Sequence, residues 1–327
     1  MNRIEDRMTI PIPTDEDGLT GRECPSVECL GYFKIKFGTG LKGENFENLP
    51  CHCPYCGYTA GHDQFWTREQ IEYAKSIALN RITTALRNDV REMDRKLRRS
   101  SRGSLIQLRM EYKGRPHPIR YYREKQLETR ITCEVCTLEY AIYGVFAYCP
   151  DCGTHNSLQI LRKNLELAEK EIALASDEED SDLAEYLIAD ALENAVSAFD
   201  GFGRETCAVH ASIASEPERA QNTSFQNLTR ANERVQNLFG VSLAGSMDQG
   251  EWEFVCRCFQ KRHILAHKMG IVDQTYIDTS GDTQAVIGRK VSITPDEVMA
   301  FIECLEQLGA YLVTELSNVP SSHAGAS

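Results

Sequence analysis

Near its C-terminal end the chain contains the stretch FQKRHILAHKMGIVD, residues 259–273, whose basic side chains are spaced for two kinds of chemistry. His263 and His267 are four residues apart, so a helix would place both imidazoles on one face, where they can share a metal ion. Arg262 precedes His267 by five residues, and an arginine with a histidine can carry out acid–base chemistry on a phosphodiester. A charged helix end without any site is the third interpretation.

Helical spacing over about 249–268 predicts the element that positions these side chains. Its apolar stripe is predicted to consist of Trp252, Val255, Cys256, Phe259 and Ala266. Arg262 and His267 fall on the two borders of this stripe, and His263 falls near its centre. A guanidinium at the border of a buried stripe is expected to have an ion-pair partner or a functional role, because burying an unpaired charge is costly. Gly270 can end the helix, so His267 is expected in the last turn.

The metal hypothesis makes His263 and His267 ligands of a zinc-dependent hydrolase. HExxH metalloproteases place a catalytic Glu directly after the first histidine, whereas this chain has Ile264 there, and no third ligand is obvious nearby. In the structural alternative, Arg262 forms an ion pair inside a helical bundle and both histidines form hydrogen bonds, with no catalytic role. The residues alone therefore leave three interpretations open.

A second kind of chemistry is indicated by paired cysteines in the middle of the chain. Cys133-x2-Cys136 is followed after twelve residues by Cys149-x2-Cys152, the spacing of a four-cysteine zinc ribbon. Pro and Gly in CPDCG let backbone N–H groups approach the sulfur atoms. Two matched pairs leave little room for a redox function. We therefore expect a zinc ion bound by four thiolates.

The N-terminal cysteines form a looser version of this pattern. The predicted ligands are Cys24, Cys29, Cys53 and Cys56. Cys51 and His52 create an alternative register, and Cys53 is preferred because CPxCG recurs in the second set. Four protein ligands at each site leave no open position for catalysis, so two structural zinc ions are expected per chain. Zinc ribbons also dock nucleic acid or protein, and the sequence leaves that role open.

The composition is that of a folded protein with room for two or three domains, since 42% of the 327 residues are apolar. No stretch reaches the roughly 18 apolar residues of a membrane span, and the N-terminal MNRIEDRMTIPIPTDEDG lacks the apolar region of a signal peptide. We therefore expect a cytoplasmic protein with no membrane partner. Thiols stay reduced in the cytosol, so the 13 cysteines favour metal binding over disulfides.

Charge is strongly segregated along the chain. The formal net charge is -12, which disfavours indiscriminate binding to nucleic acid. Residues 81–130 nevertheless carry 15 Lys/Arg against 6 Asp/Glu, a local excess of +9 that leaves -21 for the rest. Such a segment can grip nucleic acid or a partner, or it can be one of two solvated faces of opposite sign that pack on each other.

The order of these features predicts a mainly α protein that ends in an all-α helical bundle. Thr67 with Gln70 fits a capping box at the start of a long amphipathic helix. Thr294, Pro295 and Glu297 supply a second capping box. Five helices of the bundle are predicted at about 158–174, 182–202, 223–239, 249–268 and 295–316. The predicted domains are a flexible lead-in (1–20), zinc ribbon 1 (21–66), the long helix with a basic insert (67–130), zinc ribbon 2 (131–156), the bundle (157–318) and a disordered tail (319–327).

The bundle resembles HEPN domains, compact all-α bundles many of which are metal-independent endoribonucleases. RHILAH matches the R-x4-H motif of that family. It lies at the end of a helix and is followed by GIVDQTY, a polar loop with Gly281 and Gly288, and a capped final helix. The resemblance covers residues 157–318, about half of the chain.

An earlier segment, ALENAVSAFDGFGRE, resembles the family helix that carries an E-x3-K-like pattern at the same site. The matching residues here are Asp200 and Arg204. The match departs from the pattern in having Asp in place of Glu and in placing Gly201 and Gly203 inside the motif.

The resemblance implies a composite site at a twofold dimer interface. Arg262 and His267 are about 140° apart on an ideal helix, so the arginine of one protomer would meet the histidine of the other. The implied reaction is attack of the ribose 2′-OH on the adjacent phosphorus, which leaves a 2′,3′-cyclic phosphate and a 5′-OH. His267 would be the general acid–base, Arg262 would stabilise charge on the phosphate oxygens, and His263 would assist.

The resemblance also implies the partners. RNA would be the substrate, and a second copy of the chain would complete the site. Whether an inhibitor or regulatory protein also binds is left open by the sequence. Family members of this kind act as toxins or in antiviral (anti-phage) defence. A binding protein with the same fold but no turnover, docking nucleic acid or protein, is the alternative.

Overall fold

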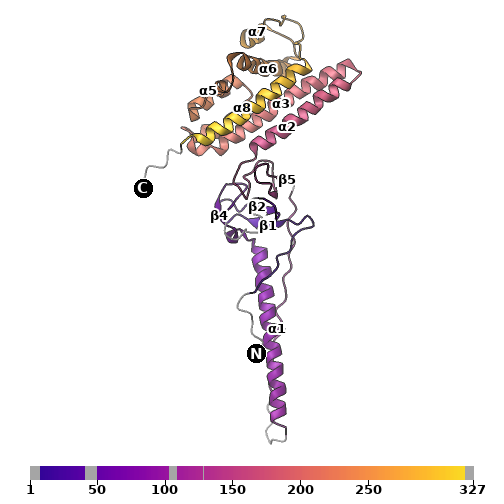
Figure 1. The fold of residues 1–327 in the computed structure, drawn as a ribbon, viewed down its shortest axis with the longest axis vertical. Coiled ribbons are helices and arrows are strands. Elements are labelled where there is room, and N and C mark those ends of the chain that lie inside the picture. Colours follow the sequence, from indigo (N-terminus) through magenta and orange to yellow (C-terminus); the bar gives the residue numbers. More distant parts are fainter. Residues whose placement is uncertain (1–7, 41–49, 103–108, 128, 321–327) are drawn as a thin grey trace. The chain divides into compact units, whose positions relative to one another are not determined.

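The computed structural model describes residues 8–40, 50–102, 109–127 and 129–320. It divides the chain into two compact units, Met1–Thr154 and His155–Ser327, called unit 1 and unit 2 below. Helices predominate in the described residues and are accompanied by small antiparallel sheets (Figure 1). In the same described ranges, none of the helices combines the length and apolar character needed to cross a bilayer. Parts of the predicted lead-in (1–7) and tail (321–327) lie outside the described residues.

Unit 1 is built on a four-stranded antiparallel sheet in the order β1-β2-β6-β5. Its strands are β1 (Thr20–Glu23), β2 (Tyr32–Ile35), β5 (Thr129–Thr132) and β6 (Glu139–Ile142). The central pair joins β2 to β6, with Ile35 opposite Tyr140. The two cysteine segments predicted as separate zinc ribbons therefore share one sheet. A shorter sheet pairs β3 (Pro50–His52) with β4 (Thr59–Gly61).

The two halves of unit 1 repeat one plan. Each half has a hairpin, β1-β2 or β5-β6, whose first strand is followed directly by the first cysteine of a metal-binding set. Reciprocal backbone hydrogen bonds link the two CPxCG turns. His52 N donates to Pro150 O at 3.0 Å, and Tyr148 N donates to Pro54 O at 2.9 Å. The halves are therefore joined both in the sheet and at their metal-binding turns.

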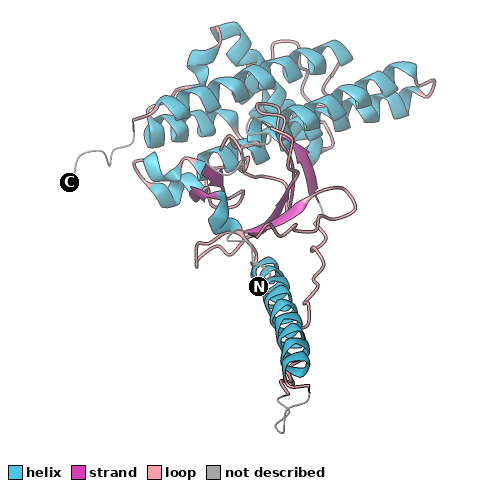
Figure 2. Ribbon diagram, turned by 60° about the horizontal axis from the view of Figure 1, so that its bottom comes forward, coloured by secondary structure: helices cyan, strands magenta, loops and turns pink. Residues whose placement is uncertain are grey.

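The long predicted helix is α1, Arg68–Ser100. Its predicted capping box is confirmed, since Thr67 Oγ1 accepts from Gln70 N and the Gln70 side chain accepts from Thr67 N, both at 3.1 Å. Gln70 Nε2 also donates to Gly21 O of β1 at 2.9 Å, which fixes the first turn of α1 to the sheet. An extended segment, residues 109–127, returns along the helix (Figure 2).

Within the residues described, the regular elements of unit 2 are all helical, and an isolated bridge joins Ile271 to Lys290. Its helices are α2 (Ser157–Asp177), α3 (Ser181–Val209), α4 (Pro217–Gln221), α5 (Leu228–Phe239), α6 (Gln249–Lys268), α7 (Gln274–Ser280) and α8 (Pro295–Asn318). Helices α2, α3 and α8 pack along one another (Figure 1). Phe199, Phe259 and Phe301 form a chain of edge-to-face ring contacts that joins α3, α6 and α8 in the core.

The helix predictions for unit 2 hold in position but differ in several bounds and caps, and α3 continues to Val209, beyond the predicted end at 202. The bounds of α6 are confirmed, but the helix expected at 223–239 begins only at Leu228, where Asn227 caps it. The stretch GIVDQTY after α6 contains the start of an additional helix, α7, because Asp273 Oδ1 accepts from Tyr276 N at 2.9 Å and caps it. At α8, Thr294 Oγ1 accepts from Glu297 N at 3.2 Å, but the reciprocal half of the predicted capping box is wrong because the Glu297 carboxylate binds Lys261 instead.

Candidate active site and metal centres

Eight cysteines of unit 1 gather into two groups of four. In each group the four sulfur atoms all lie within 4.8 Å of one another, and the closest pairs are 3.4 to 3.7 Å apart. The structure thus brings together both ligand sets that the spacing predicts, and Cys51 lies outside them. The first group is Cys24, Cys29, Cys53 and Cys56, and the second is Cys133, Cys136, Cys149 and Cys152.

These separations fit a tetrahedral metal ion bound by thiolates. Four sulfur atoms at the usual Zn–S bond length of about 2.3 Å lie about 3.8 Å from one another. Each group supplies all four ligands from the chain, so the coordination is closed to water and substrate. Both groups are therefore suited to hold a structural metal ion.

The backbone around the CPxCG turns supports negatively charged sulfur. Burial raises the pKa of the Cys53 and Cys149 thiols, and hydrogen bonding from backbone N–H groups, of Tyr55 and Cys56 at Cys53 and of Asp151 and Cys152 at Cys149, acts in the opposite direction. Such hydrogen bonds favour a thiolate and orient it toward the metal. The glycine that closes each turn has a positive φ, 70° at Gly57 and 73° at Gly153. This conformation explains why Gly follows the last cysteine in both sets.

In unit 2, helix α6 carries the R-x4-H sequence and has firmly defined ends. Asp248 and Glu251 form a capping box at its start. At its end Met269 and Gly270 both have positive φ, 54° and 77°, and Gly270 N donates to Ile264 O at 2.9 Å. This arrangement is a Schellman-type stop, with Met269 rather than the predicted Gly270 in the first left-handed position. His267 consequently lies in the last turn, as predicted.

The predicted apolar stripe on α6 is wrong in its second half. Ala266 and His263 are both exposed, although the stripe places them at or near its centre. Ile264, about 100° from His263 around the helix, is buried in a small cluster with Val272, Tyr276 and Val291. The end of α6 therefore packs against the 270–291 segment, which creates a second buried face that helical periodicity alone does not indicate.

Arg262 and the two histidines point into different surroundings. Arg262 is half-buried, and its Nε is buried with no hydrogen-bond partner among the described residues. His263 and His267 are exposed, and their ring centres are 4.8 Å apart. Partial burial, followed by the nearby cations His267, Lys268 and Arg262, lowers the pKa of His263. Within the described residues of one chain, no hydrogen bond joins Arg262 to either histidine.

Lys261, next to Arg262, was not singled out from the sequence. It is buried, and its Nζ donates to both carboxylate oxygens of Glu297 at 2.7 and 2.8 Å and to Ser292 O at 2.8 Å. This buried ion pair ties α6 to the start of α8 and fixes the rotation of α6 about its axis. Lys261 thereby positions Arg262, His263 and His267. A lysine between a glutamine and an arginine gives no local signal of burial.

Asp200 and Arg204 lie together on α3 and are engaged with a neighbouring loop. Arg204 Nε binds Asp200 Oδ2 at 3.0 Å. Asp200 is buried, and its Oδ1 accepts from Phe225 N at 2.6 Å and Ser224 Oγ at 3.1 Å. Among the residues described, neither side chain has a hydrogen bond or ion pair to Arg262 or His267. In a single chain the pair holds the loop before α5.

The two histidines alone do not make a metal centre in one chain. Their rings lie side by side as an i,i+4 pair should. Across residues 8–40, 50–102, 109–127 and 129–320, however, the only groups of three or more suitable ligands are the two cysteine sets. The hydrolase interpretation of His263 and His267 therefore lacks a third protein ligand.

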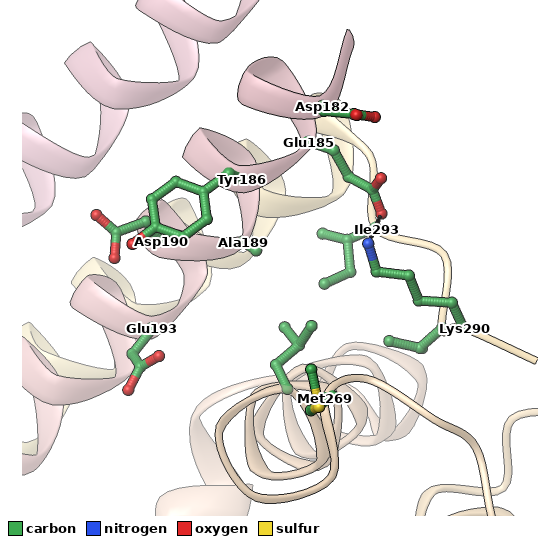
Figure 3. A pocket seen from close by; sticks show the side chains of 11 residues that line it. Asp182, Glu185, Tyr186, Ala189, Asp190, Glu193, Met269, Lys290 and Ile293 are labelled. Carbon is green, nitrogen blue, oxygen red and sulfur yellow. Dashed lines mark ion pairs between the residues drawn. The ribbon is translucent and has the colours of Figure 1, made fainter.

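A cleft of about 480 Å³ lies beside the end of α6 (Figure 3). Leu265, Val291 and Ile293 supply apolar walls, and Glu185 of α3 forms an ion pair with Lys290 at 2.6 Å. The remaining charged lining residues are Asp182, Asp190 and Glu193. This acidic wall would repel a phosphate backbone.

Comparisons of the chain with protein-family models, with curated proteins and with solved structures find no match.

Proposed function

We propose that unit 2 is a HEPN-like bundle that cleaves RNA by transesterification at a composite site formed by two copies of the chain. The observation that carries this proposal is the placement of Arg262 and His267. Both lie at the end of α6, yet they face different directions and are not joined within one chain. The partly buried Arg262 guanidinium also retains an Nε without a hydrogen-bond partner among the described residues.

In this proposal each residue has a separate task. The exposed His267 takes the proton of the ribose 2′-OH and returns a proton to the departing 5′-oxygen. Arg262 of the other copy donates to the non-bridging oxygens as their charge grows. His263 lies beside His267, and its lowered pKa keeps it neutral near pH 7, so it can accept a hydrogen bond there. Lys261 positions all three through α8.

The two cysteine groups are proposed to bind one zinc ion each. Zinc prefers tetrahedral thiolate sites, and bound zinc would cross-link turns from distant parts of the chain. Reduced thiols are required, and all 13 cysteines are free in the structure. A cytoplasmic location would keep them so.

Cleavage of single-stranded RNA by the purified chain tests the proposed function. We expect cleavage in the presence of EDTA, products ending in a 2′,3′-cyclic phosphate and a 5′-OH, and no cleavage by Arg262→Ala or His267→Ala. Zinc content is measured after the EDTA treatment, so that loss of unit 1 is not mistaken for loss of the site. Arg234→Ala, at an exposed position on α5, is the matched control. Equal cleavage by the two site variants would refute the proposal.

A binding module without turnover is the second candidate. The favouring observation is that Asp200, the carboxylate in the second motif, is occupied by Arg204, Ser224 and Phe225. RNA that binds with a steep dependence on salt but is never cut would select this candidate.

A further inference from the structure

Helix α1 and the extended segment that packs along it are rich in basic residues. Residues 81–102 and 109–121 are called the basic arm below. Met110 N donates to Asp94 Oδ1, and His117 N donates to Thr83 Oγ1, both at 3.0 Å. Arg120 N donates to Ser76 Oγ at 2.9 Å. Residues later in the returning segment therefore bind residues earlier in α1, so the segment runs antiparallel to the helix (Figure 2).

One face of the arm carries a ladder of arginines. Arg87, Arg91 and Arg95 follow one another at four-residue steps, so they fall within an arc of about 80° and rise over about 12 Å. Arg91 and Arg95 are exposed and Arg87 is half-buried. In the described part of the chain none of the three makes an ion pair, in contrast to Arg98, which binds Asp94 at 2.8 Å.

The returning segment adds cations beside this ladder. Residues between Met110 and His117 must lie along the helix between Asp94 and Thr83, which places Lys113 and Arg115 next to the arginines. Both side chains are exposed. The Asp94 carboxylate is already engaged by Met110 N and Arg98, and Glu111 is the one acidic residue between Met110 and His117. The face is therefore a row of cations with little internal neutralisation.

An aromatic platform lies near the other end of the arm. Tyr121 is 78% exposed, and its ring contacts that of Tyr73 with the centres 6.1 Å apart. On an ideal helix Tyr73 falls in the same arc as the arginine ladder, about 40° from Arg87. The arm thus combines cations with an exposed ring on one side, the combination that binds single-stranded nucleic acid.

The apolar side chains of α1 lie on a different face. Leu79, Ile82, Leu86 and Met93 are all 42 to 48% exposed and fall about 100° or more from the centre of the ladder on the other side. Protein interfaces usually centre on apolar and aromatic anchors, whereas the described part of this face is mainly cationic, with Met110 and Tyr121 as its exposed large hydrophobic side chains. The ladder face is accordingly better suited to a phosphate backbone than to an acidic protein.

We propose that the basic arm binds single-stranded RNA, with the Arg87–Arg91–Arg95 ladder, Lys113 and Arg115 on the phosphates and Tyr121 stacked on a base. Guanidinium groups bind phosphate through two hydrogen bonds at once, and aromatic stacking tolerates any base. The choice of RNA over DNA rests on the proposed function of unit 2. Binding at the arm itself requires no cleavage.

The test uses the full-length, zinc-loaded chain carrying Arg262→Ala and His267→Ala, so that cleavage does not interfere. Affinity for a labelled single-stranded RNA of mixed sequence is measured across a salt series. In this background Arg87→Gln with Arg91→Gln and Arg95→Gln should weaken binding on the order of 100-fold at about 0.1 M salt and lower the salt slope by about 2. Gln keeps a high helix propensity, so α1 should remain folded, as circular dichroism will check.

The matched control removes the same charge from α4 and α5, through Arg219→Gln, Arg230→Gln and Arg234→Gln, and should leave affinity and salt slope unchanged. Tyr121→Ala should weaken binding about 5-fold or more at an unchanged slope, and Tyr121→Phe should not. Equal binding by the ladder variant and its parent would overturn the proposal. So would preferential binding of a polyglutamate peptide, which would make the arm a surface for an acidic protein. Ladder-dependent binding by a chain that never cuts RNA would uphold the arm and reject the nuclease.

Discussion

The two units differ in how completely one chain assembles its candidate site. In unit 1 all eight predicted cysteine ligands converge, each set with its sulfur atoms within 4.8 Å. In unit 2 the residues of the R-x4-H motif share one helix end but face different surroundings, with Arg262 half-buried and His267 exposed. A metal ligand set must close within a few ångströms, so spacing predicts it well. The spacing of residues in one chain does not predict how residues from two chains would come together in a proposed shared site.

Loss of one metal site should have the largest effect, because the two halves of unit 1 share a sheet. Structural zinc contributes on the order of 10 kcal/mol to the folding of small domains. Cys136→Ser should therefore unfold the β5–β6 half and, through the β2–β6 pairing, weaken the first site as well. We expect bound zinc to fall from two to below one per chain, while the helical signal of unit 2 remains.

Cys304→Ser is the control, because Cys304 lies on α8 outside both metal groups. Elemental analysis and limited proteolysis of both variants provide the measurement. One zinc fully retained by Cys136→Ser would show that the two sites are independent, despite the shared sheet.

The buried ion pair that positions α6 should give the next largest effect. Lys261→Met leaves the Glu297 carboxylate without its partner, so we expect a loss of about 3 kcal/mol in the free energy of unfolding. The double variant Lys261→Met with Glu297→Leu should recover most of that loss, since it removes both charges. Urea unfolding measures both. If Lys261→Met were as stable as the parent chain, the proposed role of Lys261 in positioning α6 would be contradicted.

Asp200 should separate structural from catalytic roles in unit 2. Asp200→Ala removes three hydrogen bonds of a buried carboxylate and should cost about 2 kcal/mol. Arg204→Ala, at a half-exposed partner, should cost about 1 kcal/mol or less. Thermal unfolding compares them. If Asp200→Asn abolished RNA cleavage at unchanged stability, holding the loop before α5 would not account for Asp200. A role in the proposed RNA-cleaving site would then be favoured.

The smallest expected effect is a dependence of unit 2 stability on pH. Burial lowers the pKa of both His210 and His263 below the ordinary value of 6.5; at His263 nearby positive charge acts in the same direction, and at His210 the hydrogen bond to Thr206 O acts against it. The unfolded chain then binds protons more readily, so this stabilisation is present above pH 6.5 and is lost as the pH falls toward the folded-state values. Urea unfolding at pH 7.5 and 5.5 should show a smaller pH effect for His210→Gln than for the parent chain. A larger effect in the variant would contradict the assignment.

Local sequence patterns predicted many of the helices and both cysteine sets, but not the contacts between residues that are distant in the sequence. The bounds of α6, the cap at Thr67 and both cysteine sets depend on residues near one another in sequence, and they were predicted correctly. The shared sheet pairs Ile35 with Tyr140, and no local pattern encodes pairing across that separation. The burial of Lys261 and the exposure of His263 depend on the packing of α8 and the 270–291 segment, which helical periodicity omits.

Mixing the two inactive variants tests the composite site most directly. In a dimer of an Arg262→Ala chain with a His267→Ala chain, one site has both groups intact and the other has neither. Random exchange of equal amounts makes half of the dimers mixed, so the account predicts that cleavage returns to roughly a quarter of the parent activity. A mixture that stays inactive after demonstrated subunit exchange, although the parent chain cleaves RNA, would contradict a site shared between two chains.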